Sequence, residues 1–207
     1  MAPVRCLSLL TALGAVLLAG PALAHHPMGG ATPNTLMEGL LSGLGHPVIG
    51  IDHLAFIVGL GLLAGLQRID VRVPLAFVVA SLLGVLAEVA GRGAPGAEML
   101  VAGSVVVVGI GMALRAHAPV LLWLGFALAA GLVHGNAFAE AVVAAEQTPI
   151  IAYLVGLAVV QGLIGWASHA LGKRMLTLPD HSVRTRPAGI VLALIGAAFF
   201  VNAYAQA

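Results

Sequence analysis

Six long apolar stretches dominate this chain of 207 residues. Each is long enough to cross the hydrocarbon core of a bilayer, which takes about 20 residues of α-helix. The stretches are continuously apolar and do not alternate, which favours helices over the strands of a membrane barrel. The sequence therefore predicts an all-α, polytopic membrane protein with six transmembrane helices. The predicted spans are Val48–Leu66, Val73–Ala90, Ala97–Leu114, Pro119–Val143, Thr148–Leu171 and Ala188–Gln206.

Charged side chains are scarce. They make up 8% of the residues, against 60% that are hydrophobic, and the mean hydropathy is +1.07. A soluble domain carries about 25% charged residues, so this chain has too few charges to cover a water-facing surface. The composition excludes a water-soluble globular enzyme and a disordered segment, and it argues against a nucleic-acid binder, which would need a basic surface. The lipid bilayer is the expected surrounding.

The first 24 residues have the pattern of a secretory signal peptide. A basic start, Met1–Arg5, precedes the apolar run Cys6–Leu18 and the cleavage pattern Ala22-Leu23-Ala24. We therefore predict a signal peptide at residues 1–24 and a single six-helix transmembrane domain at residues 25–207. The alternative is an uncleaved first membrane helix. Because Cys6 would leave with the signal peptide, the mature chain would have no thiolate for a metal site or a disulfide.

The short loops predict the orientation of the spans. When loops are numbered alternately from the outside, seven basic residues fall inside and Arg92 alone falls outside. The seven are Arg68, Arg72, Arg115, Lys173, Arg174, Arg184 and Arg186. Because Lys and Arg concentrate on the cytoplasmic side, we expect a multi-pass protein of the inner membrane with its mature N-terminus and C-terminus in the periplasm.

Ionisable side chains cluster at the start of the first span, in His46-Pro47-Val48-Ile49-Gly50-Ile51-Asp52-His53. Such groups are costly in a bilayer and indicate function, and two imidazoles with a carboxylate suit Ni²⁺, Co²⁺ or Zn²⁺. In an unbroken helix His46 and His53 would lie about 10 Å apart along the axis. A shared ion therefore requires an irregular chain near Pro47 and Gly50, or a helix that begins at Pro47. The alternative is two histidines hydrogen-bonded within the bundle. A short helix at residues 34–44 is expected to lead into this span.

A second polar set lies in the fourth predicted span, with His134 deep in the membrane and Glu140 toward the outer face. Glu38, Glu88 and Glu146 are also predicted at the outer side. An acidic vestibule above the His/Asp cluster would concentrate cations. Solvated helix ends are the simpler interpretation of Glu88, Glu98 and Glu146.

Histidines also begin the predicted mature chain. An N-terminal histidine chelates through its amine and Nδ1, so His25 and His26 are candidates for capturing metal before transfer. An exposed polar tail is the alternative. In later spans, Gln161, Ser168, His169 and Asn202 either line a path or hydrogen-bond between helices, and the second interpretation is favoured.

The segment from His46 to His53 resembles the H-P-x-x-G-x-D-H motif of the HupE/UreJ family of nickel/cobalt permeases. The His-starting mature chain, the six helices and the H-G-x-A segment at His134–Ala137 are also similar to that family. The resemblance covers essentially the whole mature chain. It implies a metal site at His46, Asp52, His53, His134 and Glu140. The sequence departs from the family at Phe138, where a second histidine is common, and at Ala139.

The resemblance implies import of nickel, with cobalt as a second substrate, for metalloenzymes such as hydrogenase or urease. A membrane metal sensor or accessory protein that hands nickel to a maturation partner is the alternative. The sequence lacks H-E-x-x-H and G-x-S-x-G, so we do not expect an enzyme, and it has no phosphate-binding loop, so we expect no nucleotide. The expected partners are a divalent metal ion, as transported substrate with no resident cofactor, and the bilayer.

Overall fold

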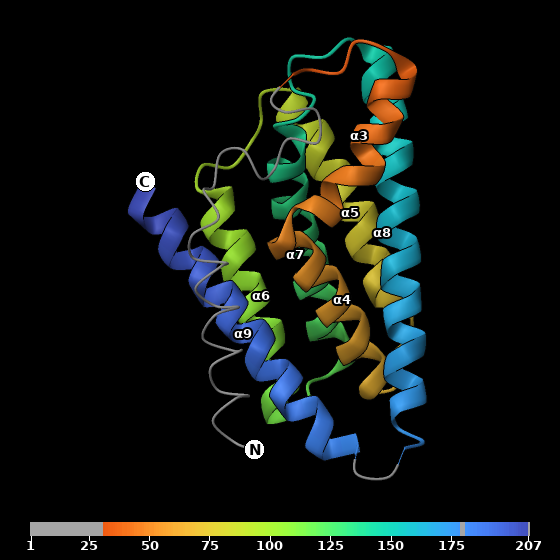
Figure 1. Ribbon diagram of the computed structural model, residues 1–207, viewed down its shortest axis with the longest axis vertical. Helices are drawn as coiled ribbons and strands as arrows, with labels where there is room; N and C mark the ends of the chain where they lie inside the picture. The colour runs from red at the N-terminus through yellow and green to blue at the C-terminus, as the bar shows by residue number, and fades with distance from the viewer. Residues whose placement is uncertain (1–30, 179–180, 207) are drawn as a thin grey trace, which may run out of the picture.

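The computed structural model describes residues 31–178 and 181–206, and over these residues it is all-helical (Figure 1). The signal peptide predicted at residues 1–24 lies outside the described residues, as do His25 and His26. The described helices are α3 (Leu36–Ile49), α4 (Ile51–Leu66), α5 (Arg72–Val89), α6 (Ala97–Leu114), α7 (Val120–Ala139), α8 (Gln147–Met175) and α9 (His181–Gln206).

Five of these helices are long and apolar enough to cross a bilayer alone: α5, α6, α7, α8 and the Thr185–Tyr204 part of α9. Helices α3 and α4 meet the same criterion only as a pair, which is bent by 74° at the break between them. The chain is therefore a multi-pass membrane protein. The bent pair covers the first of the six predicted spans, so the described residues hold five candidate spans, or six if the pair is one span.

Several predicted boundaries are wrong. The expected short helix at 34–44 continues to Ile49, so the straight part of the first span begins at Ile51 and not at Val48. Helix α7 ends at Ala139, four residues before the predicted Val143, so Glu140 lies at the C-cap of the helix. Helices α8 and α9 extend beyond the apolar runs, because hydrophobicity marks only the lipid-buried part of a helix.

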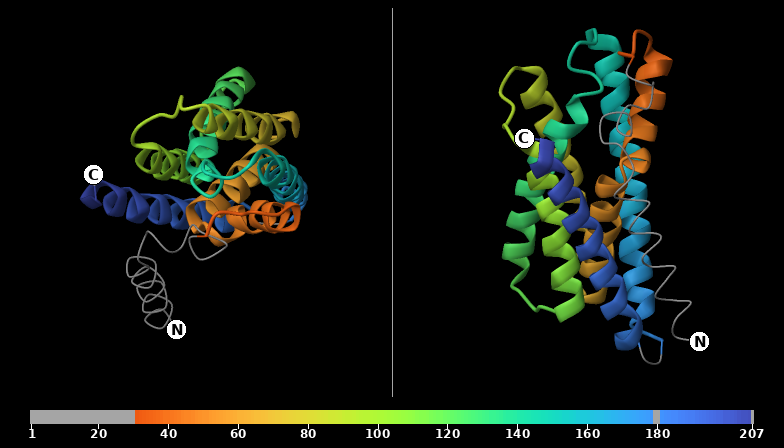
Figure 2. Two further views of the ribbon diagram at one scale, coloured as in Figure 1. Left: turned by 90° about the horizontal axis from the view of Figure 1, so that it is seen from above. Right: turned by 60° about the vertical axis from the view of Figure 1, so that its left-hand side comes forward.

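Three groups of closely packed helices build the bundle: α5 with α7, α6 with α9, and α8 with both α3 and α4 (Figure 2). Glycines bring the backbones into contact. A Cβ on Gly135 of α7 would collide with the carbonyl oxygen of Ser81 on α5, and a Cβ on Gly43 of α3 would collide with that of Tyr153 on α8. Small residues allow this close approach in lipid, where burial of apolar surface does not drive association.

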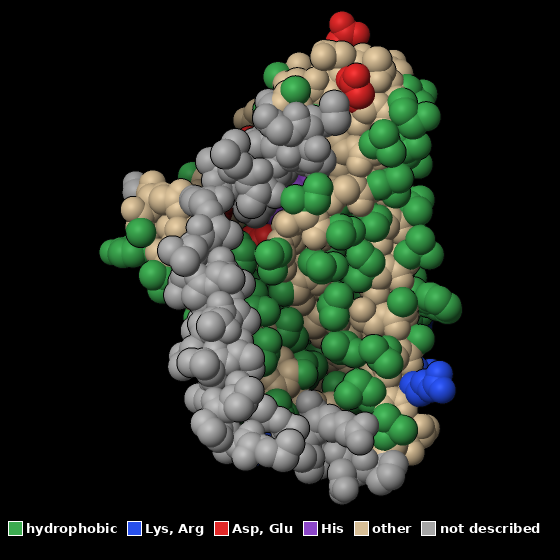
Figure 3. All heavy atoms as spheres, viewed as in Figure 1, with side chains coloured by type: hydrophobic (Ala, Val, Ile, Leu, Met, Phe, Trp, Pro, Cys, Tyr) green, Lys and Arg blue, Asp and Glu red, His purple; other side chains and the backbone are tan. Residues whose placement is uncertain are grey.

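Charged side chains separate to the two ends of the bundle. Figure 3 shows acidic groups toward the end where α3 begins, a basic group toward the opposite end, and a mainly apolar face between them. The opposite end holds Arg68 and Lys173 around one cavity and Arg115 beside another. Between the ends, the core of α4–α7 is apolar and includes Phe56, Phe77 and Trp123.

Candidate metal centre

The break between α3 and α4 brings His46 beside His53. Gly50 separates the helices with ψ 98°, while its N–H still donates to the carbonyl of His46 at 3.0 Å. The two imidazole centroids are 5.9 Å apart, much closer than the roughly 10 Å of axial rise in an unbroken helix. The predicted irregularity is confirmed, but the turn falls at Gly50, and Pro47 lies within the last turn of α3.

Glycine is needed at position 50 because a side chain there would collide with His53, and not because of its backbone angles. Its φ of −72° is open to any residue. A Cβ at this position, however, would lie 2.7 Å from Cδ2 of His53. The absence of a side chain at Gly50 therefore lets the His53 ring lie against the break.

The ionisable side chains of the cluster are buried. His46 and His53 are each 1% exposed, His134 is 0% exposed and Asp52 is 5% exposed. They come from α3, α4 and α7. Burying polar groups costs free energy unless hydrogen bonds replace those to water, so their partners define what each ring can do.

Tyr153 of α8 fixes the proton on His46. The Tyr153 hydroxyl donates to the backbone carbonyl of Phe138 at 2.7 Å and lies 2.9 Å from Nδ1 of His46. A carbonyl only accepts, so the single tyrosine proton is committed to Phe138, and Nδ1–H of His46 must donate to Tyr153. As a neutral ring, His46 then carries its lone pair on Nε2.

A second chain of hydrogen bonds fixes His134 and His53. Ser104 of α6 donates its proton to the carbonyl of Val101 at 2.6 Å, so it accepts from Nε2–H of His134 at 2.9 Å. Nδ1 of His134 is then an acceptor, and Nδ1–H of His53 donates to it at 2.9 Å. His53, like His46, carries its lone pair on Nε2.

The hydrogen bonds give the three histidines different roles. In His46 and His53 the Nδ1–H donates to a neighbour, and a hydrogen bond at one ring nitrogen is how proteins orient an imidazole that ligates a metal through the other. His134 uses both ring nitrogens in hydrogen bonds. Asp52 adds a carboxylate in the first turn of α4, where its Oδ1 accepts from the backbone N–H of His53 at 2.9 Å.

The side chains do not converge on a common point in this conformation. Within the described part of the chain, no three His, Cys, Asp or Glu side chains are placed to hold one metal ion together. A shared ion therefore requires these side chains to move relative to one another.

Two neighbouring cavities, which share lining residues, lie between the acidic end of the bundle and this cluster. The outer cavity, of about 290 Å³, is lined by Glu88, Glu98 and Glu140. The inner cavity, of about 10 Å³, has room for about one water molecule and is lined by Glu98, Glu140, Asp52 and His53. Glu98 and Glu140 thus belong to both cavities, which we call the vestibule and the inner cavity.

The vestibule agrees only partly with the predicted acidic groups. Glu88, Glu98 and Glu140 line it, but Glu38 instead accepts from backbone N–H groups in the capping box of α3. Asn136 helps to shape it, because its Oδ1 accepts at 2.6 Å from the N–H of Ala94 in the connection between α5 and α6.

Sequence analysis missed Tyr153 and Ser104, which orient the imidazoles. Each is a hydroxyl side chain within an apolar span, and Tyr153 is also 0% exposed. A hydroxyl in an apolar helix commonly bonds to its own backbone or to a neighbouring helix, so the sequence alone carries no signal that selects these two as partners of histidines.

These features define an all-helical, multi-pass membrane protein with a buried imidazole and carboxylate cluster at a broken span. The chain matches the family model described as HupE / UreJ protein over residues 13–199. It is similar to Protein HupE of Rhizobium leguminosarum bv. viciae, with 31% identity over 194 residues, or 89% of this chain and 94% of that protein. The chain belongs to the HupE / UreJ family, as the motif at His46–His53 predicted. No solved structure matches it.

Proposed function

We propose that the protein is an inner-membrane secondary permease that imports Ni²⁺, and also Co²⁺, from the periplasm. Family membership supports this proposal, because the HupE/UreJ family is associated with nickel or cobalt uptake for hydrogenase or urease. The observation that carries it is the pairing of His46 and His53 across the break at Gly50, with each ring held by a hydrogen bond at Nδ1. The metal ion is the transported substrate, and we propose neither a resident cofactor nor an enzymatic reaction.

The proposed entry step is electrostatic. Three carboxylates in the vestibule raise the local concentration of dications, and the inner cavity holds about one water, too few to hydrate an ion fully. The carboxylate of Asp52 and the Nε2 atoms of His46 and His53 then replace lost water ligands. Glu140 guides the ion inward, and His134 becomes a further ligand when it releases His53.

The proposed driving force is the membrane potential, or exchange for protons. Inward movement of each positive charge is favoured by about 2.3 kcal/mol per 100 mV, so a dication gains twice that. In the proposed orientation both ends of the mature chain are periplasmic, and we propose that His25 and His26, at its start, capture metal before it enters the vestibule.

Uptake of radiolabelled nickel by cells tests the proposal. We expect His46→Ala, Asp52→Asn and His53→Ala each to reduce uptake to background while the protein remains in the membrane. His117→Ala is the matched control, because His117 is exposed at the basic end, and it should transport normally. Near-normal uptake by all three site variants would reject the site. Metal binding by purified protein without movement into proteoliposomes would instead indicate an accessory protein.

A further inference from the structure

Polar side chains recur along the buried length of α8. Tyr153 contacts His46, Gln161 follows eight residues later, and His169 follows after another eight. At 1.5 Å per residue, each interval is about 12 Å. Gln161 is 0% exposed and His169 is 8% exposed. By contrast, the core formed by α4 with α5–α7 inward of the histidines is lined by apolar side chains such as Phe56, Leu60 and Phe77.

Counting protons at Ser81 fixes the orientation of the Gln161 amide. The Ser81 hydroxyl lies 2.8 Å from the carbonyl of Val78 and 2.8 Å from the Gln161 amide. The one hydroxyl proton must go to the carbonyl of Val78, which cannot donate, so Gln161 must present its NH₂ group to Ser81. The carbonyl oxygen of Gln161 then takes the other amide position.

That other position has no hydrogen-bond partner among the described atoms. Gln161 therefore holds a buried carbonyl oxygen that nothing in this part of the chain satisfies. An unsatisfied acceptor in a dry interior is unfavourable for folding, and such an oxygen is a suitable ligand for a partly dehydrated cation.

Gly165, one turn inward from Gln161, leaves space between three helices. A Cβ at Gly165 would have only two neighbours within 4 Å: Cβ of Pro74 on α5 at 3.6 Å and Cγ2 of Ile57 on α4 at 3.9 Å. Ile57 is one turn inward from His53. Gln161 and Gly165 thus lie along the line where α8 meets α5, and Gly165 also meets α4 at Ile57. We call this line the α8 seam.

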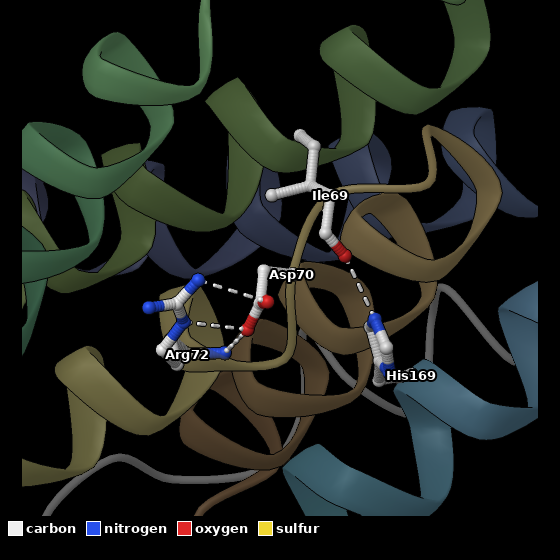
Figure 4. Close-up of polar contacts among 4 residues, drawn as sticks. All are labelled: Ile69, Asp70, Arg72 and His169. Atoms are coloured by element: carbon white, nitrogen blue, oxygen red, sulfur yellow. Dashed lines mark hydrogen bonds and ion pairs between the residues drawn. The ribbon is translucent and has the colours of Figure 1, made fainter.

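The largest cavity described at the basic end of the bundle, of about 510 Å³, is lined by His169, which lies one turn beyond Gly165 on α8. Nε2–H of His169 donates to the carbonyl of Ile69 at 2.8 Å (Figure 4), so the neutral ring has its lone pair on Nδ1. Asp70 lies in the same cavity, but Arg72 binds its carboxylate at 3.0 Å (Figure 4). The hydrogen bonds from Arg72 hold the pKa of Asp70 below its usual value. Asp70 is therefore an anion that is already paired with a cation.

Cationic side chains make this cavity suited to release. Arg68 and Lys173 line it together with His169. Their charges disfavour a resident dication, and a conducting pathway needs sites that bind weakly enough for the ion to leave.

We propose that the metal ion leaves the histidine cluster along the α8 seam, with the amide oxygen of Gln161 as its mid-membrane ligand and His169 as its last protein ligand. This inference rests on the proposed function. It assigns to Gln161 and His169 a role on the path, whereas sequence analysis favoured hydrogen bonds between helices.

Reconstituted protein with a metal-sensitive dye trapped inside the vesicles tests the route, with Co²⁺ as the probe. Gln161→Leu removes the amide oxygen, and Gly165→Ala adds a methyl group that the seam accommodates at ordinary contact distance. We expect both variants to bind Co²⁺ with a Kd within about threefold of wild type, because the histidine cluster is intact. The maximal transport rate should fall about tenfold in Gln161→Leu and about threefold in Gly165→Ala.

Gly162→Ala is the matched control. It adds the same methyl group to the same helix where nothing lies within 4 Å, and it should transport at the wild-type rate. The thermal unfolding temperature of Gln161→Leu should equal or exceed that of wild type, because the substitution removes an unsatisfied oxygen. If the Gln161 amide were purely structural, Gln161→Leu would instead unfold at a lower temperature than wild type. Its transport rate per folded protein would be unchanged.

A wild-type transport rate in Gln161→Leu overturns the route while leaving the permease proposal intact. Wild-type protein that binds Co²⁺ but transports none overturns the permease proposal and the route with it. Loss of transport in Gln161→Leu with normal binding and stability supports the route.

Discussion

The ring of Phe138 lies against the ring of His53, with centroids 4.2 Å apart and planes tilted by 36°. The same ring contacts His46 with a centroid distance of 5.2 Å. Phe138 therefore occupies, from α7, the space beside both imidazoles that meet across the break. The sequence departs from the family motif at this residue, and the departure falls inside the cluster.

The first prediction concerns this position. Phe138→His should tighten Co²⁺ binding by about tenfold, because it adds a nitrogen ligand beside two oriented imidazoles. Titration calorimetry of the purified protein measures the change in Kd. Phe138→Leu, which keeps the position apolar, should leave Kd near that of wild type. Equal affinities for the histidine and leucine variants would show that residue 138 does not reach the bound ion.

Tyr153→Phe should weaken metal binding by about 10- to 100-fold, the usual effect of losing a group that orients a metal ligand. The variant keeps the ring but removes the hydroxyl that receives the Nδ1 proton of His46, so the ring can take the wrong tautomer. Calorimetry again gives Kd. Tyr204→Phe is the control, because Tyr204 is 73% exposed. An unchanged Kd in Tyr153→Phe would mean that His46 is oriented without Tyr153.

Neutralising the vestibule should affect capture more than translocation. We expect Glu98→Gln to raise the apparent KM for uptake about three- to tenfold at low ionic strength with little change in maximal rate. The effect should shrink as salt screens the lost charge. Glu146→Gln removes an equal charge from a residue that does not line the vestibule, so its KM should remain unchanged. An equal rise in KM in the two variants would show that overall surface charge, and not the vestibule, causes the effect.

Close packing of α5 and α7 gives a prediction about folding. Gly135→Val should destabilise the protein by at least about 1–3 kcal/mol, because its side chain would collide with the Ser81 backbone and overpack the interface. Gly125→Val lies on the same helix with open space around it and should change stability by less than about 0.5 kcal/mol. Thermal unfolding in detergent compares the two. Similar stabilities would mean that the helices separate at little cost.

Much of the architecture could be predicted from the sequence, because apolar length and helix-breaking residues mark what lipid requires of a chain. The sequence indicated a break near Pro47 and Gly50 but could not select between the two residues. Pro47 removes one backbone donor, and the last turn of α3 tolerates that loss, whereas the place of the turn depends on the ring of His53 packing against Gly50. That contact exists only after folding.

The residue types of the cluster could be predicted from the sequence, but the hydrogen bonds that orient each histidine could not. Periodicity identifies neighbours within one helix, but Tyr153 is 107 residues from His46, and Ser104 is 30 residues from His134. The resemblance implied His134 as a ligand. In this conformation its two nitrogens instead receive and donate hydrogen bonds within the protein, and its part in metal binding stays a prediction.

Helix α8 runs without interruption for 29 residues, while its partners α3 and α4 divide that length between them. The two segments that carry His46 and His53 thus both pack on one continuous helix, and Gly50 joins them. A swing of either segment would change the spacing between the imidazoles, and it would also shift backbones that pack directly on α8 at Gly43 and Gly65. In the proposed permease, release of an ion held between the two imidazoles would therefore be coupled to the contacts of α3 or α4 with α8.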